Sequence, residues 1–255
     1  MQFIDTHCHL YLPEFNNDIP DVFLRAEAAG VKKFYLPAID SSVVNDMLAM
    51  EKNYPEKCIL MAGLHPCSVN QNYRDELDLV EKKIQERSFA AIGEIGLDFY
   101  WSTEFTNMQY ESFEMQMHWA LQKNWPIVIH TRNAMEQTID AVKSFAAKGL
   151  KGIFHCFGGS YEDAMQIINM GFYLGIGGVL TYQKSGLDEV VKKIALEHIV
   201  LETDAPYLTP VPFRGRRNES SYIKIIAEKL AEIKNISIEE VAQITTANAE
   251  KIFNT

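Results

Sequence analysis

The sequence predicts an α/β protein with a TIM-type (β/α)8 barrel, in which parallel strands form the core and helices the outside. Short apolar runs alternate eight times with helical segments, and strand–helix alternation is typical of parallel sheets. The length of 255 residues matches the ~250 residues of one such barrel. Because no linker or low-complexity stretch interrupts the alternation, residues 1–255 are expected to form a single domain.

The expected strands are short, continuous apolar runs, which suit strands buried on both faces. They cover residues 3–5, 33–37, 58–63, 89–93, 126–129, 151–154, 172–176 and 198–201. A doubly wound open sheet is the alternative. It is less favoured because no Gly-x-Gly-x-x-Gly motif follows the first run.

The expected helices are recognised by apolar residues at helical spacing and by capping residues. A first helix starts near Asp21 and stops at Gly30, and Asp40 can cap the second. Ser237 and Glu240 fit a capping box in a helical tail. The helices between them are expected at 75–86, 106–123, 134–145, 160–169 and 188–195.

Composition is that of an ordinary globular enzyme, with 47% hydrophobic and 23% charged residues. The net charge of −10 argues against broad electrostatic binding of nucleic acid, although a metal site could still neutralise a phosphate locally. The four cysteines form no Cys-x-x-Cys pair, and neither a leader-like start nor a ~20-residue apolar run is present. We therefore expect a cytoplasmic protein with reduced thiols.

Side chains of metal-ligand type gather at the carboxyl ends of the expected strands, where barrel enzymes place their chemistry. They are His7, His9, His65, Glu94, His130, His155, Glu202 and Asp204. Residues present for unrelated reasons would be spread over both rims. The shared rim therefore indicates one site, whereas His118 and His198 fall outside it.

The ligand types favour two divalent ions over one. Four imidazoles and two carboxylates are too many for one tetrahedral ion with an open position, but they suit two ions that share a bridging carboxylate. The predicted ligands are His7, His9, Glu94, His130, His155 and Asp204. Glu94 is the expected bridge, and Asp204 is expected to accept a proton from the attacking water. The ions could be Mg²⁺, Mn²⁺ or Zn²⁺.

Six motifs occur in order along the whole chain. They are Asp5-Thr6-His7-Cys8-His9-Leu10, Gly63-Leu64-His65-Pro66, Gly93-Glu94-Ile95-Gly96-Leu97-Asp98, His130-Thr131-Arg132, His155-Cys156-Phe157-Gly158-Gly159 and Leu201-Glu202-Thr203-Asp204-Ala205-Pro206-Tyr207-Leu208. Together they resemble the TatD family of metal-dependent deoxyribonucleases, within the amidohydrolase-like superfamily. The resemblance implies a TIM-type barrel, a divalent-metal centre with the same six ligands, and His65 and Arg132 lining the pocket.

The segment after the eighth strand carries the only concentrated positive charge, at Arg214, Arg216 and Arg217. Arginine forks match phosphate geometry, so Arg216 and the neighbouring Asn218 are expected to contact substrate. A solvated loop without a partner is the alternative.

The same segment also departs from the family pattern. Ser220 stands where the resembling family commonly has Pro. Elsewhere, in the loop after His155, Gly158 stands where the family often has Ser.

Aromatic residues after the fourth strand could stack on bases or simply pack a loop. They are Phe99, Tyr100, Trp101 and Phe105.

The resemblance implies hydrolysis of DNA phosphodiester bonds, commonly from a 3′ end, and single-stranded or frayed DNA ends are the expected substrate. A metal-dependent hydrolase of a carbonyl substrate, such as a cyclic amide, an ester or an aminoacyl ester on RNA, is the alternative. It is less favoured because Glu94 stands where such enzymes often carry a modified lysine. A non-enzymatic metal-binding protein is a third reading, disfavoured by the open coordination expected here. No membrane or protein partner is implied.

Overall fold

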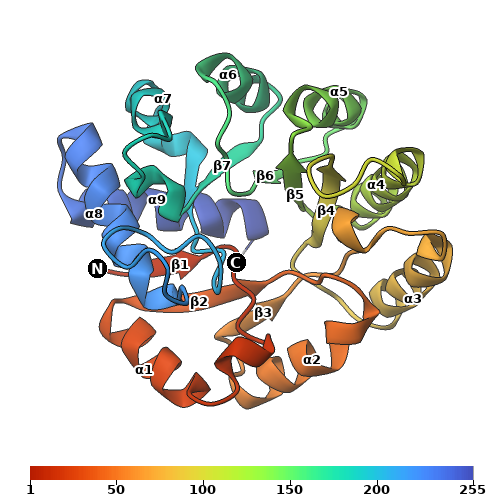
Figure 1. Ribbon diagram of the computed structural model, residues 1–255, viewed down its shortest axis with the longest axis horizontal. Coiled ribbons are helices and arrows are strands. Elements are labelled where there is room, and N and C mark those ends of the chain that lie inside the picture. The colour runs from red at the N-terminus through yellow and green to blue at the C-terminus, as the bar shows by residue number, and fades with distance from the viewer. Residues whose placement is uncertain (255) are drawn as a thin grey trace.

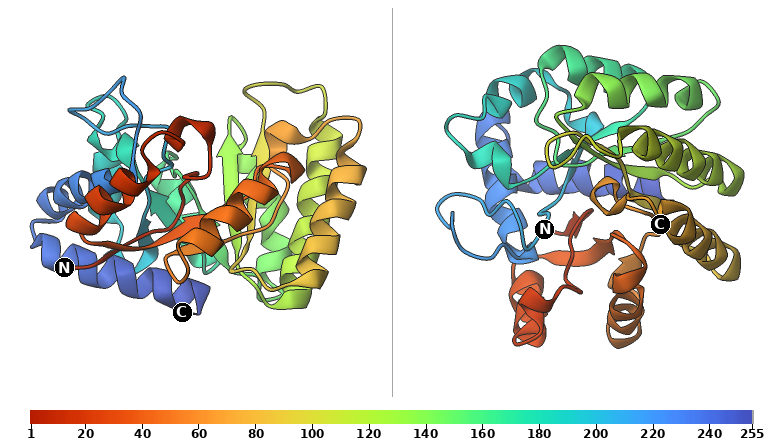
Figure 2. Two further views of the ribbon diagram at one scale, coloured as in Figure 1. Left: turned by 90° about the horizontal axis from the view of Figure 1, so that it is seen from below. Right: turned by 45° about the vertical axis from the view of Figure 1, so that its right-hand side comes forward.

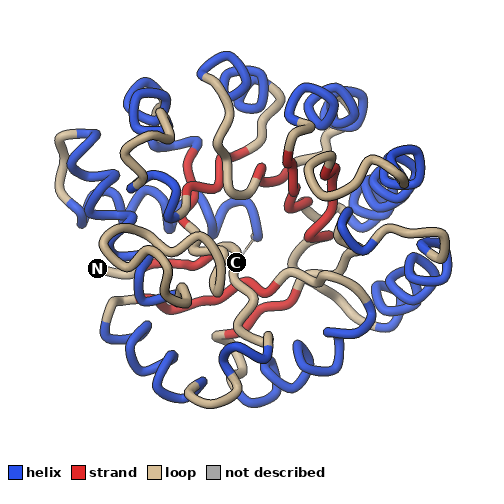
Figure 3. Tube along the Cα trace, in the orientation of Figure 1, coloured by secondary structure: helices blue, strands red, loops and turns tan. Residues whose placement is uncertain are grey.

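The buried apolar runs form eight parallel strands arranged in a ring, with helices outside it (Figures 1 and 3). The computed structural model describes residues 1–254. The strands are β1 Phe3–Asp5, β2 Val31–Leu36, β3 Cys58–Leu60, β4 Ile92–Asp98, β5 Ile127–Arg132, β6 Gly152–Phe154, β7 Tyr173–Ile176 and β8 Ile199–Leu201. The predicted barrel architecture is confirmed.

The ring consists of two sheets, β1-β2-β3 and β4-β5-β6-β7-β8. Backbone hydrogen bonds join them at both seams. Between β3 and β4, the amide of Gly93 donates to the carbonyl of Ala62 at 2.8 Å. Between β8 and β1, the amide of Thr6 donates to the carbonyl of Leu201 at 3.1 Å. These bonds bring all eight carboxyl ends of the strands to one rim.

One helix begins at its predicted cap, Ser237, whereas Asp40 caps the short 3-10 turn Ser41–Val43 that precedes the second helix. The Ser160 hydroxyl and the Asp163 carboxylate form a capping box, and the Ser237 hydroxyl accepts from the amide of Glu240. The helices are α1 Ile19–Ala28, α2 Val44–Asn53, α3 Tyr73–Glu86, α4 Thr106–Lys123, α5 Met135–Ala146, α6 Tyr161–Asn169, α7 Leu187–Lys193, α8 Ile223–Lys234 and α9 Ile238–Phe253. None of these described helices is both long and apolar enough to cross a bilayer.

The barrel interior is filled by one residue from each strand or its immediate flank. They are Ile4, Tyr35, Met61, Ala91, Val128, Ile153, Tyr173 and Val200. At the end where the strands begin, α9 lies across the barrel (Figure 2). Its Phe253 ring stacks on Tyr35 at a centroid distance of 3.9 Å. The interior is therefore a packed core, and only the opposite rim is available for chemistry.

The largest difference from the predicted elements is in β4. This strand was expected at 89–93 but spans Ile92–Asp98, and β5 continues to Arg132. The prediction that Glu94 and His130 follow their strands is therefore wrong, because both lie within them. Gly93, Glu94 and Gly96 interrupt the apolar run, so the sequence pattern did not show that the strand continues through them. Gly96 is required there, since a Cβ would lie 2.0 Å from the carbonyl oxygen of His130.

Truncating Phe253, the ring of α9 that stacks on Tyr35 in the barrel interior, should destabilise the whole barrel. Phe253 is 5% exposed, so Phe253→Ala should lower the free energy of unfolding by about 3–5 kcal/mol, the usual cost of deleting a buried ring. Urea denaturation measures this change. Leu24→Ala on the outer face of α1, where the side chain is 63% exposed, serves as the control and should change stability by less than ~0.5 kcal/mol. Equal effects would contradict the role of α9.

Candidate metal centre

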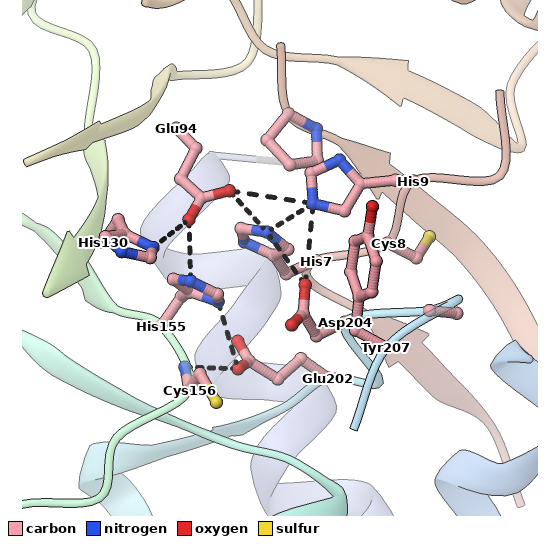
Figure 4. Close-up of polar contacts among 12 residues, drawn as sticks. His7, Cys8, His9, Glu94, His130, His155, Cys156, Glu202, Asp204 and Tyr207 are labelled. Atoms are coloured by element: carbon pink, nitrogen blue, oxygen red, sulfur yellow. Dashed lines mark hydrogen bonds and ion pairs between the residues drawn. The ribbon is translucent and has the colours of Figure 1, made fainter. Parts of the chain in front are cut away.

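All six predicted ligands come together at the carboxyl-end rim of the barrel (Figure 4). They arrive from five places around the ring: the segment after β1, β4, β5, and the segments that follow β6 and β8. His65, after β3, joins them. Residues up to 197 positions apart in the sequence (His7 and Asp204) thus meet because parallel strands present their carboxyl ends on one side.

Glu94 lies at the middle of this cluster, and its two carboxylate oxygens face different histidines. Oε2 lies 3.1 Å from Nε2 of His7 and 3.7 Å from Nε2 of His9. Oε1 lies 2.8 Å from Nε2 of His155 and 2.9 Å from Nδ1 of His130. A carboxylate whose oxygens point at two separate sets of nitrogen donors has the arrangement of a bridging ligand.

Asp204 closes the open side of the cluster. Its Oδ1 lies 3.5 Å from Nε2 of His9 and 3.7 Å from Nε2 of His7. Its backbone is held by a 2.9 Å hydrogen bond from its amide to the carbonyl of His7. The side chain of Asp204 is 13% exposed and that of Glu94 is 3% exposed. Asp204 is therefore the ligand-type carboxylate that solvent reaches.

Three groups of side chains in the described part of the chain have ligand atoms within 4.8 Å of one another. They are His7-His9-Glu94, His7-His155-Asp204 and His65-Glu94-His130. Imidazole nitrogens and carboxylate oxygens are suitable donors for divalent ions. The donor set thus fits a metal centre.

The electrostatics of the cluster favour ionised carboxylates. Burial opposes ionisation of Glu94, yet the charges of His155, His65 and His7 hold its pKa well below the usual range. The same balance lowers the pKa of Asp204, where burial is outweighed by a hydrogen bond from His9 and the charge of His155. One buried and one partly exposed anion beside imidazoles are an electrostatic environment that suits a divalent cation.

A second layer of side chains orients the histidines. Nε2 of His130 lies 2.8 Å from Oδ2 of Asp98, so the other ring nitrogen, Nδ1, faces Glu94. Nδ1 of His9 lies 2.7 Å from the Tyr11 hydroxyl, which donates to the carbonyl of Pro37. Such outer contacts fix the ring tautomer of metal-binding histidines.

Sequence reasoning missed Tyr11 and Asp98, and gave Glu202 no role. Nδ1 of His155 lies 3.5 Å from Oε1 of the fully buried Glu202. Spacing was the available signal. Asp98 lies four residues after Glu94 on β4, whereas Tyr11 lies in the turn after His9 and gave no such signal. An even spacing along an extended chain places side chains on the same side.

Asp5 joins β1 to the segment after β8. Its carboxylate accepts hydrogen bonds from the amide and hydroxyl of Thr203, at 3.0 and 2.6 Å, and from the Ser220 hydroxyl at 2.6 Å. Burial raises the pKa of Asp5 to about 7, against the opposing effect of these hydrogen bonds. Ser220, the departure from the family pattern, therefore contributes directly to the support of the rim.

The predicted substrate-binding residues separate into two groups. His65 lies in the cluster, with Nε2 3.3 Å from Oε1 of Glu94, and Arg132 and Arg216 are exposed. The structure corrects the expectation for Asn218, whose side chain is fully buried. Its amide donates to the carbonyls of Thr203 and Tyr207, so it positions the loop and cannot contact substrate.

Arg217 also differs from the expectation of a free phosphate-binding arginine. Its guanidinium donates to both carboxylate oxygens of Asp18, at 2.7 Å each, and to the carbonyl of Glu14. Arg214 lies with its guanidinium carbon 3.8 Å from the centre of the Tyr182 ring and stays exposed. Arg214 and Arg216 are thus the exposed arginines of this segment, whereas the Arg217 side chain is 28% exposed and paired with Asp18.

Comparisons with known proteins agree with this geometry. A family model described as TatD related DNase matches residues 4–254. YabD of Bacillus subtilis, an uncharacterized metal-dependent hydrolase, is 37% identical over 250 residues, which cover 98% of either chain. YcfH of Escherichia coli, described in the same words, is 30% identical over 263 residues, covering 100% of this chain and 96% of its own. The crystal structure of YjjV, a TatD homolog from Escherichia coli, matches with a TM-score of 0.93 at 29% identity, covering 99% of this chain and 98% of that one.

Changing Asp98 should weaken metal binding without unfolding the protein. In Asp98→Asn, an amide that donates to Nε2 of His130 leaves the ring proton on Nδ1, which faces the centre. That tautomer cannot ligate from Nδ1. We expect about 10–100-fold lower affinity for Mn²⁺ by isothermal titration, the usual cost of losing an outer contact. Glu114→Gln, at an exposed position on α4, is the control. Unchanged affinity in Asp98→Asn would show that the contact does not orient His130.

Proposed function

This chain belongs to the TatD-related DNase family of metal-dependent hydrolases, and from that premise we propose that it hydrolyses phosphodiester bonds in DNA. The proposed activity is a 3′–5′ exonuclease on single-stranded or frayed ends. The observation that supports it most is the split orientation of the Glu94 oxygens, between His7 and His9 on one side and His130 and His155 on the other. Paired ions on such a bridge are typical of phosphate-transferring sites.

We propose that the ligands divide between two ions. His7 and His9 with Oε2 of Glu94 would hold one, and His130 and His155 with Oε1 would hold the other. Bound there, divalent ions would supply positive charge opposite the phosphate and make a water acidic enough to be deprotonated near neutral pH. No serine or cysteine nucleophile is then required.

Asp204 is the proposed proton acceptor. Its lowered pKa keeps the carboxylate ionised at neutral pH, and its partial exposure lets it meet a water that enters from the rim. A general base must lie within hydrogen-bond reach of the proton that it takes. Glu94 is too deeply buried for this role. We therefore assign bridging to Glu94 and proton transfer to Asp204.

The surroundings of the centre suit a strand end. The chain carries a net charge of −10, so an anionic polymer is attracted only where cations are exposed. Arg132 on one side of the rim, and Arg214 and Arg216 on the segment after β8, provide such charge. A centre inside a barrel mouth is reached by an unpaired end more readily than by a base-paired interior, which must first be unstacked.

A panel of substrates with purified protein tests the proposal. With Mg²⁺ or Mn²⁺, the protein should release mononucleotides from a single-stranded oligonucleotide, and Glu94→Gln should lower kcat by at least ~10³-fold. One electrostatic donor alone is worth ~10²–10³-fold, and the amide cannot bridge two ions. The variant should bind fewer ions by elemental analysis and unfold normally, since Glu94 lies at the rim. Hydrolysis of cyclic amides or aminoacyl esters without cleavage of DNA would overturn the phosphodiesterase proposal in favour of carbonyl chemistry.

The exposed arginine of the segment after β8 provides a second test. Arg216→Ala should lower kcat/KM for an oligonucleotide relative to a small nitrophenyl phosphodiester by about tenfold, because a phosphate-positioning contact acts only on the longer substrate. Arg217→Ala is the matched comparison. It should lower the melting temperature, since Asp18 loses the two hydrogen bonds from Arg217 and keeps only that from Arg25, but leave that ratio closer to wild type. The reverse pattern would show that Arg217 contacts the substrate.

A further inference from the structure

Two aromatic side chains stand out at the rim because they face solvent. Trp101 is 68% exposed and Tyr100 is 52% exposed. They follow β4 directly, on the loop that leads to α4. Their neighbours Phe99 and Phe105 behave differently, since both are partly buried and pack against the core. A loop that needed aromatics only for its own packing would bury Tyr100 and Trp101 in the same way.

The backbone of this aromatic pair is fixed to the metal centre by one carboxylate. Oδ1 of Asp98 accepts hydrogen bonds from the amides of Tyr100, at 2.9 Å, and Trp101, at 3.1 Å. Oδ2 of the same residue meets His130. The Gln109 side chain also holds the Asp98 backbone: Oε1 of Gln109 accepts a hydrogen bond from the amide of Asp98, and Nε2 of Gln109 donates one to the carbonyl of Asp98. The pair is thus held in place before any ligand binds, which lowers the entropic cost of binding.

Arg132 adds a cation to the pair. Its guanidinium carbon lies 3.8 Å from the centre of the Tyr100 ring and 5.2 Å from that of Trp101. The two rings meet edge to face, at 5.0 Å and 85°. Asp98 and Arg132 are paired across β4 and β5, as are Gly96 and His130, so the group lies two residues beyond His130, roughly 7 Å along the strand.

We propose that Tyr100, Trp101 and Arg132 form a stacking subsite for an unpaired nucleobase beside the scissile phosphate. This proposal rests on the proposed function and narrows its substrate to single-stranded nucleic acid that carries bases. Aromatic rings and a planar guanidinium stack on any base, because every base has a π-face. A base-paired nucleotide cannot use the subsite without leaving its stack.

Fluorescence gives a direct test, because Trp101 is the strongly exposed residue of the three tryptophans; Trp119 is buried and Trp125 is partly buried. The Mg²⁺-loaded protein would be titrated with a phosphorothioate-linked thymidine hexamer, which resists hydrolysis, and with a hexamer of the same backbone without bases. We expect the base-bearing hexamer alone to quench the emission, and Trp101→Phe to abolish the quenching. Equal responses to both hexamers would overturn the proposal.

Kinetics give an independent test. Trp101→Ala should lower the ratio of kcat/KM for the oligonucleotide to kcat/KM for a nitrophenyl phosphodiester by about 5- to 150-fold, the range for loss of one stacked base. Trp101→Tyr should restore much of the ratio. Met115→Ala, which removes an exposed apolar side chain from α4, is the control and should leave the ratio unchanged.

The outcomes separate this proposal from the proposed function. If wild-type protein cleaves the oligonucleotide and Trp101→Ala keeps the wild-type ratio, the stacking subsite is overturned while the nuclease function stands. If no phosphodiester is cleaved but base-dependent quenching is seen, the subsite is supported and the nuclease function is overturned.

Discussion

The Glu94 carboxylate, buried among imidazoles, is the group around which the side chains at the rim of this barrel are arranged. An anion that is 2% exposed would be costly if it lacked partners. Here each oxygen has histidine nitrogens within 3.1 Å. Those histidines come from separate strands, so the anion can be accommodated only when the ring of strands has formed. Folding and assembly of the site are therefore one event, and neither His7 nor His155 could satisfy Glu94 from an isolated fragment.

The outer contacts extend this dependence into the loops. Asp98 holds His130 with one oxygen and the amides of Tyr100 and Trp101 with the other. Asp5 does the same at the β8–β1 seam, where it binds Thr203 and Ser220. In both places a buried carboxylate links a strand end to the loop beside it. Such links help to position side chains within the narrow tolerance that a functional site requires.

Sequence alone predicted the barrel and the meeting of the six candidate ligands at one rim, because strand–helix alternation and the carboxyl-end rule are local patterns with a topological consequence. Prediction from sequence failed where contacts between distant parts of the chain determine whether a side chain is buried or paired. Glu94 lies inside β4, since an inward position at the mouth of a barrel tolerates a polar residue that an apolar run would not contain. The pairing of Arg217 with Asp18, 199 residues apart, and the burial of Asn218 leave no trace in local sequence. A cluster of arginines in the sequence indicates positive charge, but only the fold shows which of them are already paired with a carboxylate.

Charge distribution also constrains the order in which ligands bind. Four carboxylates lie among the imidazoles at the rim, on a chain with a net charge of −10: those of Glu94, Asp98, Glu202 and Asp204. A phosphate diester that approached this centre without cations would meet like charge at close range in a poorly solvated site, where repulsion is strong. Divalent ions held by these side chains would supply the opposing positive charge, and the exposed Arg132, Arg214 and Arg216 would add to it from the edge. If the proposed phosphodiesterase function holds, this charge distribution favours metal binding before the binding of an anionic substrate.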